Sequence, residues 1–517
     1  MKYLRLIGNI NPANVLRKYD WAVILVIFCA FYIQFDLLEY IQRGPFSIHA
    51  WRQSDCLSMA LNYYQFNLPL LEPQIHHLLG GEGKAVGEFP ILYFFVGQLY
   101  HIFGPNVLVY RVVWLLITYF GILCLYRFLL QVSKNTFGSI LGVIAIIGIP
   151  IYNFYSVSFI SDAVSLSISF IAAYFVLRYI DSSRLLHLIF FFILFSLSAL
   201  LKITSIVPFL AALGAACLFL VLDKGFRKNY FKKISYLFLA FTLSGLLVFG
   251  WYSYANYYQE MHNTTYFFLT TNSFWDTDPE IHREIWKNIK DKLYPFNIAS
   301  ILILSALAIF YLTVRKRFLV ASIIFITLIG LGGCVFIWFG QYQYHDYYLV
   351  PFLGIVPLVV CFAWLFFQEA FIPSYKKFLI PFLGAISAFG IFHLGGKKMN
   401  ERTNGYYAWD YTSRFEQVEG LSEYMRDLGF KATDKVISVP DPSPNISLYL
   451  LNVKGITNVY GKNKSEDTFR ESLEYGVTHV VVLDSNYLNE FDFIKAYLGE
   501  KMGEKNGVSI YPIQGVN

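Results

Sequence analysis

The feature that most constrains this chain is a series of long apolar runs, most of which lack any charged side chain. A helix needs about 20 apolar residues to cross the hydrocarbon layer of a bilayer. The runs lie at residues 21–41, 107–130, 137–153, 158–179, 185–201, 203–222, 234–257, 298–314, 317–339, 347–368 and 377–394. We therefore predict a polytopic α-helical membrane protein with about 11 transmembrane helices.

The composition is typical of an integral membrane protein. Hydrophobic residues make up 56% of the sequence and aromatic residues 19%, whereas only 15% are charged. Soluble domains carry about a quarter charged residues, so a soluble protein of this length is excluded. The net charge of +6 does not indicate a nucleic-acid partner, because the basic residues form short clusters between the apolar runs. No CxxC pattern or disulfide framework is present.

The basic residues of the short loops lie mainly on one side of the predicted membrane bundle. If the loops are assigned to alternate sides, one side receives nearly all of the lysines and arginines that the N-terminus and the short loops carry: Lys2, Arg5, Arg17, Lys18, Lys134, Arg178, Arg184, Lys224, Arg227, Lys228, Lys232, Lys233, Arg315, Lys316, Arg317, Lys376 and Lys377. Cytoplasmic loops are enriched in basic residues, so we predict a multi-pass inner-membrane protein with a cytoplasmic N-terminus. The odd number of spans places the C-terminus outside. Lys397 and Lys398 run against this assignment, but long translocated domains escape the charge rule.

Three regions on the predicted outer side are long. They cover residues 42–106, residues 258–297 and the chain from 399 to 517. In the last region, Val436–Val439 and Val480–Leu483 resemble strands, and the pattern from Asp467 to Tyr475 between them is helical. We therefore divide the chain into a transmembrane catalytic domain at 1–398 and a small extracytoplasmic α/β domain at 399–517.

The first outer loop carries an acidic residue at the start of a helical pattern. Ser54 or Asp55 could cap that helix, and Leu57, Leu61 and Tyr64 follow at helical spacing. This pattern predicts an amphipathic helix that lies on the membrane surface. Asp55 would then stand at the mouth of the bundle, either as a helix cap or as a catalytic group.

Further ionisable residues occur at the same predicted membrane face. Glu88 precedes a helix that Pro90 starts, where a carboxylate also suits the helix dipole. Asp162 lies near the outer start of the fourth run, Lys202 at the outer end of the fifth, and His345 before the tenth. A snorkelling lysine or an interfacial cap would explain single members of this set. Ionisable groups at membrane depth are costly and usually functional, so their common sidedness favours a site.

Acids and cations at one membrane face suit chemistry on an anionic lipid. A carboxylate can act as the general base on an acceptor hydroxyl. A lysine, arginine or histidine can stabilise a phosphate that leaves the anomeric carbon of a sugar. The same arrangement would place the lipid tail among the helices.

Five short motifs resemble those of GT-C glycosyltransferases, in the group related to protein O-mannosyltransferases and the lipid A aminoarabinose transferase. The motifs are Trp51-Arg52-Gln53-Ser54-Asp55, Gly87-Glu88-Phe89-Pro90, Ser161-Asp162-Ala163, Leu201-Lys202-Ile203-Thr204 and His345-Asp346-Tyr347-Tyr348. Their order and sidedness, over about residues 45–395, carry the resemblance.

The resemblance implies a GT-C-like fold and an inverting glycosyltransferase. Its donor would be a polyprenyl-phosphate-linked sugar, and its acceptor a glycolipid, polysaccharide or protein at the outer membrane face. The implied catalytic residues are Asp55, the proposed base, with Glu88 and Asp162. The implied substrate-binding residues are Arg52, Lys202, His345, Tyr344 and His262.

The first acidic site departs from the family pattern, and the histidines argue against a metal. Many relatives have Asp-Glu at the first acidic site, where this chain has Asp55-Cys56. The adjacent His76 and His77 rarely reach one ion together on a regular element. We therefore expect no cofactor, and a divalent metal is not favoured.

Two other classes remain open from the sequence. A transporter or flippase of lipid-linked saccharides would disperse polar residues along a central path. A polysaccharide polymerase or ligase would share the lipid-phosphate chemistry but not the paired helices of the first outer loop. One outer cavity shared by Asp55, Asp162, Lys202 and His345 would favour the glycosyltransferase.

Overall fold

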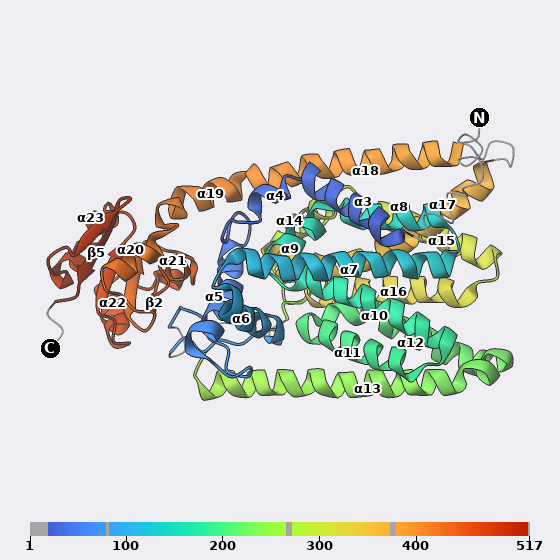
Figure 1. The fold of residues 1–517 in the computed structure, drawn as a ribbon, viewed down its shortest axis with the longest axis horizontal. Helices are drawn as coiled ribbons and strands as arrows, with labels where there is room; N and C mark the ends of the chain where they lie inside the picture. The colour runs from blue at the N-terminus through green and yellow to red at the C-terminus, as the bar shows by residue number, and fades with distance from the viewer. Residues whose placement is uncertain (1–18, 79–81, 265–270, 373–378, 515–517) are drawn as a thin grey trace.

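The computed structural model describes residues 19–78, 82–264, 271–372 and 379–514. A helical bundle runs along the long axis, and the C-terminal residues form a smaller part at one end of it (Figure 1). The predicted cytoplasmic N-terminus at residues 1–18, together with Lys376 and Lys377, lies outside the described residues.

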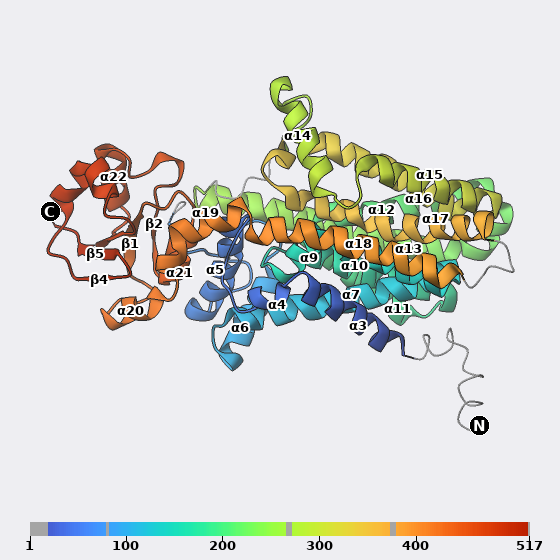
Figure 2. The same cartoon turned by 90° about the horizontal axis from the view of Figure 1, so that it is seen from above.

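The bundle is built from helices that lie roughly parallel to its long axis (Figure 1). Its members are α3 (Asp20–Gln34), α4 (Leu37–Tyr40), α7 (Val107–Ser133), α8 (Thr136–Ile147), α9 (Pro150–Val157), α10 (Asp162–Ser182), α11 (Leu185–Leu201), η1 (Ile203–Ile206), α12 (Val207–Leu222), α13 (Lys224–Met261), α15 (Ile298–Val314), α16 (Phe318–Ile337), η2 (Phe339–Gln343), η3 (Asp346–Ile355), α17 (Val356–Phe371) and α18 (Leu379–Asn404). A further helix, α14 (Pro279–Lys292), projects from the side of the bundle (Figure 2).

The polytopic helical architecture predicted from the sequence is confirmed, but the number of spans is not. Among the described residues, 7 helices are long and apolar enough to cross a membrane, or up to 8 if one bent pair counts as a single span. The bent pair is α8 and α9, which meet at 68° in place of the predicted straight run at 137–153. Pro150 causes the break, because proline disfavours helical geometry in the residue before it. Three other predicted spans, α3, α11 and α15, are apolar helices of 15, 17 and 17 residues.

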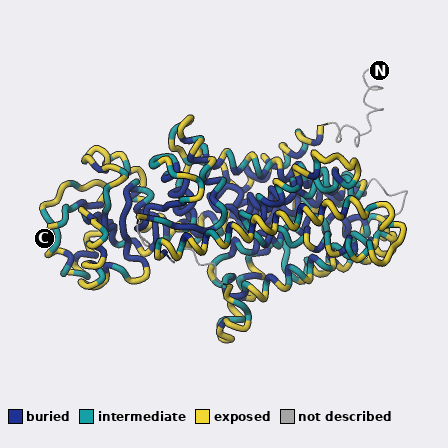
Figure 3. The backbone as a smooth tube through the Cα atoms, turned by 90° about the horizontal axis from the view of Figure 1, so that it is seen from below, coloured by how far each residue is buried: buried dark blue, intermediate teal, exposed yellow. Residues whose placement is uncertain are grey.

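The outward surface of the bundle is apolar. Figure 3 shows buried backbone along its axis and exposed backbone around it. Large side chains such as Leu222, Phe249, Ile329 and Phe389 are 60–71% exposed on this surface. Such side chains are stable against lipid and unfavourable against water, which is what membrane-crossing helices require.

The two helices of the first outer loop lie between the bundle and the C-terminal part (Figure 1). They are α5 (Ala50–Phe66) and α6 (Ile91–Phe103). The prediction that Ser54 or Asp55 caps the first of these helices is wrong. The helix α5 begins at Ala50, and its polar residues Gln53, Ser54 and Asn62 are buried. Gln53 donates to the carbonyls of Phe46 and Ile48 in the same loop, Asn62 donates to the carbonyl of Ser58, and the carbonyl of Ser54 accepts from Asn445 of the C-terminal part. The loop itself and the C-terminal part together cover these side chains.

The last long helix of the bundle continues past the predicted domain boundary at 398. It runs to Asn404 as α18 and is followed by α19 (Tyr406–Phe415), η5 (Glu416–Val418) and α20 (Leu421–Asp427). Gly395 allows close packing, since a Cβ there would stand 2.4 Å from the carbonyl oxygen of Gly148. The glycine pair at 395–396 is therefore part of a helix contact inside one continuous helix.

The small C-terminal sheet region predicted from the sequence is confirmed. It has five strands in the order β2-β1-β3-β5-β4. The parallel strands are β1 (Lys435–Val439), β2 (Lys454–Ile456) and β3 (His479–Val482), and the antiparallel edge is formed by β4 (Gly503–Lys505) and β5 (Val508–Pro512). The connections contain α21 (Ile446–Leu451), η6 (Val459–Gly461), α22 (Glu466–Leu473), α23 (Tyr487–Glu490) and η7 (Asp492–Tyr497).

The first outer loop binds the edge of this sheet. The amide of Leu78 donates to the carbonyl of Gly455 at 2.8 Å, and the amide of Gly455 donates to the carbonyl of His76 at 3.0 Å. The Lys454 ammonium donates to Gln74 Oε1 at 2.7 Å. The loop therefore lies alongside β2 like an extra strand and fixes the C-terminal part over the end of the bundle.

Candidate functional site

A polar cavity of about 340 Å³ lies where the outer loop, the bundle and the C-terminal part meet. Side chains from α5, the start of α10, the junction of α11 and η1, and η3 surround it. Its lining residues are Trp51, Arg52, Asp55, Gly87, Glu88, Ser161, Asp162, Leu201, Lys202, Tyr252, Gln341, His345, Tyr347, Tyr348, Pro444 and Tyr460.

Most of the residues singled out in the sequence line this cavity together. They are Arg52, Asp55, Glu88, Asp162, Lys202 and His345. Two others are not among its lining residues. The Tyr344 side chain is 68% exposed, and His262 packs against the Tyr258 ring at the end of α13, with ring centroids 4.6 Å apart.

Arg52 connects two of the acidic residues. Its guanidinium donates to Glu88 Oε2 at 2.5 Å and lies 3.9 Å from Asp55 Oδ2, one helical turn away on α5. Glu88 also accepts hydrogen bonds from the Tyr93 hydroxyl and, at 3.4 Å, from Ser161 Oγ. Burial opposes ionisation of Glu88, but the Arg52 charge, the hydrogen bond from Tyr93 and the Lys202 charge together hold the pKa of this carboxyl below its ordinary value. Glu88 is thus a fixed anion that orients Arg52.

Helix ends place the second ion pair. Asp162 is the first residue of α10, and Lys202 stands in extended conformation where α11 gives way to η1. Lys202 Nζ lies 2.8 Å from Asp162 Oδ1 and 3.5 Å from the centroid of the Tyr348 ring. An aromatic face attracts a cation through its negative quadrupole, so the lysine is held at the cavity wall by two partners.

The His345 imidazole in the lining is neutral at physiological pH. Burial, together with the nearby positive charges of Lys202 and Arg52, lowers the pKa of its imidazole to about 4. The ring can therefore donate or accept a hydrogen bond in the cavity but carries no charge near pH 7.

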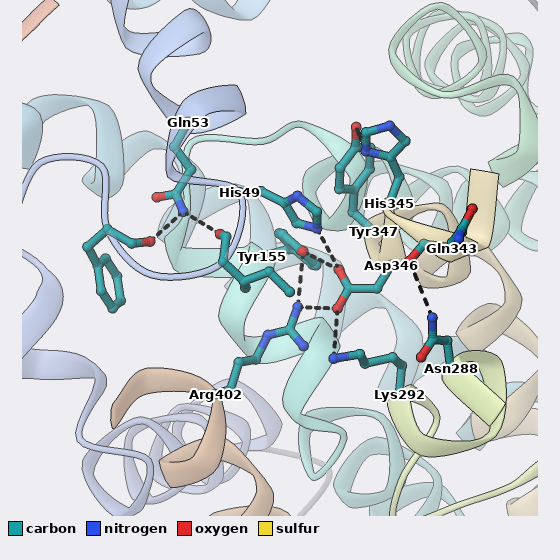
Figure 4. A network of polar contacts seen from close by, with 12 residues as sticks. His49, Gln53, Tyr155, Asn288, Lys292, Gln343, His345, Asp346, Tyr347 and Arg402 are labelled. Carbon is teal, nitrogen blue, oxygen red and sulfur yellow. Dashed lines mark hydrogen bonds and ion pairs between the residues drawn. The ribbon is translucent and has the colours of Figure 1, made fainter. Parts of the chain in front are cut away.

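The next residue, Asp346, belongs to a buried ionic network beside the cavity (Figure 4). Its carboxylate lies 3.3 Å from His49 Nε2, 2.7 Å from the Arg402 guanidinium and 4.0 Å from Lys292 Nζ, and it accepts a hydrogen bond from Tyr155. These partners come from the start of α5, α9, α14 and α18. The network ties four segments to the wall that presents His345.

Four lining residues lie outside the motifs found in the sequence: Tyr252, Gln341, Pro444 and Tyr460. Tyr252 lies inside the long helix α13, where a tyrosine is unremarkable by pattern. Pro444 and Tyr460 lie in loops of the C-terminal part, which carries no motif that we could assign. Within the described residues, no three His, Cys, Asp or Glu side chains lie close enough together to hold a metal ion.

A second cavity, apolar and about 480 Å³ in volume, lies within the bundle. It is lined almost entirely by apolar side chains of α7, α10, α12, α13, α16 and the segment from η3 to α17. On α10 its lining begins at Leu166, one turn beyond Asp162, and extends to Ile180. At 1.5 Å per residue this stretch is about 21 Å long, which is most of the thickness of a bilayer core.

Comparisons with known proteins agree with this architecture. The family model of dolichyl-phosphate-mannose-protein mannosyltransferases matches residues 88–252. No curated protein matches the sequence. Two crystal structures of ArnT from Cupriavidus metallidurans share the fold at 10% sequence identity, over 95% of this chain and 96% of theirs. The apo structure gives a TM-score of 0.61, and the structure bound to undecaprenyl phosphate gives 0.57. The resemblance found in the sequence motifs is confirmed.

Proposed function

We propose that this GT-C superfamily protein is an inverting glycosyltransferase that transfers a sugar from a polyprenyl-phosphate donor to an acceptor. The acceptor would be a glycolipid, polysaccharide or protein at the outer face of the inner membrane. One observation carries the proposal. Three carboxylates and two cations line a single polar cavity at one end of the bundle, and the lining of an apolar cavity between the helices begins on α10 one turn beyond Asp162.

The apolar cavity supports a lipid-linked donor. Its lining starts one helical turn from Asp162, the partner of Lys202. A donor whose phosphate lies at Lys202 could therefore place its isoprenoid chain directly among the apolar side chains. The fold is also that of ArnT, which has been seen bound to undecaprenyl phosphate.

The proposed reaction is a single displacement at the anomeric carbon. Asp55 accepts the proton of the acceptor hydroxyl, and the hydroxyl oxygen forms the new glycosidic bond. The bond from the anomeric carbon to the phosphate oxygen breaks, and its electron pair leaves with the polyprenyl phosphate. Lys202 and Arg52 stabilise this leaving anion. Attack opposite to the leaving group inverts the configuration, and the step as proposed uses no metal or other cofactor.

The distribution of charge supports an outer location for this cavity. The basic start of α13 and the basic turn between α15 and α16 lie at the end of the bundle away from the C-terminal part (Figure 1). Under the positive-inside rule these turns are cytoplasmic, so the cavity and the C-terminal part would face the periplasm.

The grouping of the charges favours an enzyme over a transporter or flippase. Those classes require polar groups along a path through the membrane. Here six of the candidate residues share one cavity at one end, and the second cavity, within the bundle, is lined almost entirely by apolar side chains.

The proposal is tested with full-length protein in membranes supplied with radiolabelled polyprenyl-phosphate sugars, a hexose, an N-acetylhexosamine and an aminopentose among them. We expect one donor to lose its sugar, in the presence or absence of EDTA. The matched variant is Asp55→Asn, which removes the basic oxygen but keeps the shape of the side chain. General-base catalysis contributes about 100- to 10,000-fold, so donor turnover should fall in that range while donor binding persists. Near-normal turnover by a folded Asp55→Asn protein would overturn the assignment.

A further inference from the structure

The C-terminal part contributes two residues to the cavity, Pro444 and Tyr460. Pro444 lies in the loop after β1, and Tyr460 in the loop after β2. These strands are parallel neighbours, so both loops leave the same edge of the sheet. The carboxyl edge of parallel strands is where open α/β sheets bind their ligands. In this molecule that edge faces the transmembrane cavity.

Tyr460 occupies an unusual backbone conformation. It has a φ of 53° and is followed by Gly461 at 81°. The turn is closed by the amide of Lys462, which donates to the carbonyl of Val459 at 3.1 Å. Glycine or asparagine normally fills the first of two left-handed positions in such a turn, because a bulky side chain is strained there. Strained residues persist where the surroundings fix them, and they gather at functional sites.

Buried polar contacts hold the turn and the neighbouring loop in place. Asn458 Oδ1 accepts from the amide of Asp441 at 2.5 Å, which joins the loop after β2 to the loop after β1. Asn463 Nδ2 donates to the carbonyl of Thr457 at 3.0 Å on the far side of the turn. Asn445 Nδ2 in turn donates to the carbonyl of Ser54, the residue before Asp55, at 3.4 Å. These hydrogen bonds connect the turn that carries Tyr460, through the loop after β1, to helix α5.

The Tyr460 ring is presented to the cavity beside the proposed base. Its side chain is 74% exposed although its neighbour Val459 is buried. Tyr460 and Asp55 line the same cavity, so the ring and the carboxylate face one enclosed space. Trp51, on the turn of α5 before Asp55, also lines the cavity with a partly exposed ring.

We propose that Tyr460, together with Trp51, forms a stacking platform that holds a saccharide acceptor against Asp55. The inference rests on the proposed function and names the acceptor class. One face of a pyranose carries mainly C–H bonds and packs on an aromatic ring, while its hydroxyls project from the edge toward polar groups. The C-terminal part is then the acceptor half of the active site, and its selectivity is for a sugar ring.

The test uses full-length protein in lipid nanodiscs and saturation-transfer difference NMR. The probes are methyl α-glucoside, methyl α-galactoside and methyl α-mannoside, and the comparison probe is an acetylated Ala-Ser-Thr-Ala amide peptide. Tyr460→Asn removes the ring and suits the left-handed backbone, whereas Tyr460→Phe keeps the ring. We expect the signal of at least one glycoside to fall about fivefold or more in Tyr460→Asn and to survive in Tyr460→Phe. Tyr406→Asn, at an exposed tyrosine of α19 outside the cavity lining, is the matched control and should bind like the wild type.

Three results would overturn the inference. They are glycoside binding that Tyr460→Asn leaves intact, no glycoside signal in the wild type, and Tyr460-dependent binding of the peptide instead of the glycosides. Donor turnover is measured separately on the same samples. A protein that consumes no donor refutes the proposed function, whereas a protein that consumes donor but shows no Tyr460-dependent glycoside binding refutes only this inference.

Discussion

Lys202 Nζ lies 2.8 Å from Asp162 Oδ1, so the cation proposed for the donor phosphate is already in contact with a carboxylate at the cavity wall. The pair is nearly buried, with side-chain exposures of 15% and 5%. A phosphate that binds Lys202 must share it with Asp162. The affinity for the donor therefore depends on how well the ammonium can serve two anions at once.

We predict that Lys202→Ala raises the KM for the donor more than Lys202→Arg does. Arginine keeps the positive charge, but its planar fork replaces the compact ammonium over Tyr348. Loss of one charged hydrogen bond weakens binding by about 1.5–3 kcal/mol, which corresponds to a factor of roughly 10 to 150. The measurement is the dependence of initial rate on donor concentration.

Lys501→Ala is the matched control for this experiment, because Lys501 pairs with Glu504 on the surface of the C-terminal part. It should leave the donor KM unchanged. An unchanged KM in Lys202→Ala would remove Lys202 from the donor site.

The sequence could predict six members of the cavity lining because it specifies the membrane face at which each residue lies. Apolar runs and basic loops assign each residue to a membrane face, and residues at one face are confined to the same end of the bundle. The pairings are different. Arg52 and Glu88 are 36 residues apart, and Lys202 and Asp162 lie on separate helix ends, so contact between them depends on how the helices pack. No local pattern encodes that packing.

The features that the sequence could not predict depend on how the first outer loop, the bundle and the C-terminal part pack together. Helix α5 has the amphipathic pattern of a surface helix, yet Gln53 and Asn62 are buried because another part of the chain covers their face. Tyr460 lines the cavity because the loop after β2 lies over α5, a contact that no local sequence pattern predicts. His262 and Tyr344 lie near the predicted membrane face but outside the cavity, because sidedness does not specify where around the bundle a residue stands.

We predict that Arg402→Ala strongly destabilises the protein. The Arg402 guanidinium and the Asp346 carboxylate are both buried, 2.7 Å apart. Removing one partner leaves the other charge without its main compensation, which typically costs about 3–5 kcal/mol. The loss is measured as a fall in the thermal midpoint of the detergent-solubilised protein. Arg414→Ala is the control, since Arg414 pairs with Asp410 on an exposed face of α19 and should cost less than about 1 kcal/mol. Equal midpoints for the two variants would contradict a structural role for the network.

The last prediction concerns acid and the contact between the first outer loop and the sheet. His76 and His77 are fully buried in that contact, and burial lowers the pKa of each to about 3 from an ordinary value of 6.5. The separated state binds protons below about pH 6.5, whereas the docked state does so only near pH 3. Docking is therefore strongest above pH 6.5 and weakens as the pH falls toward 3. At pH 5 the loss amounts to about 2 kcal/mol for each histidine.

Hydrogen exchange measures this loss directly. Protection factors of residues 74–78 and 454–456, corrected for the intrinsic pH dependence of exchange, should fall between pH 6.5 and pH 4. His76→Gln should reduce the dependence by about half, because glutamine cannot take up the proton that His76 binds after it leaves Ser58 and Asn452, its hydrogen-bond partners, whereas His77 still titrates. His101→Gln, at an exposed histidine of α6, should behave like the wild type. Constant protection down to pH 4 in the wild type would mean that the two buried imidazoles do not control docking of the C-terminal part.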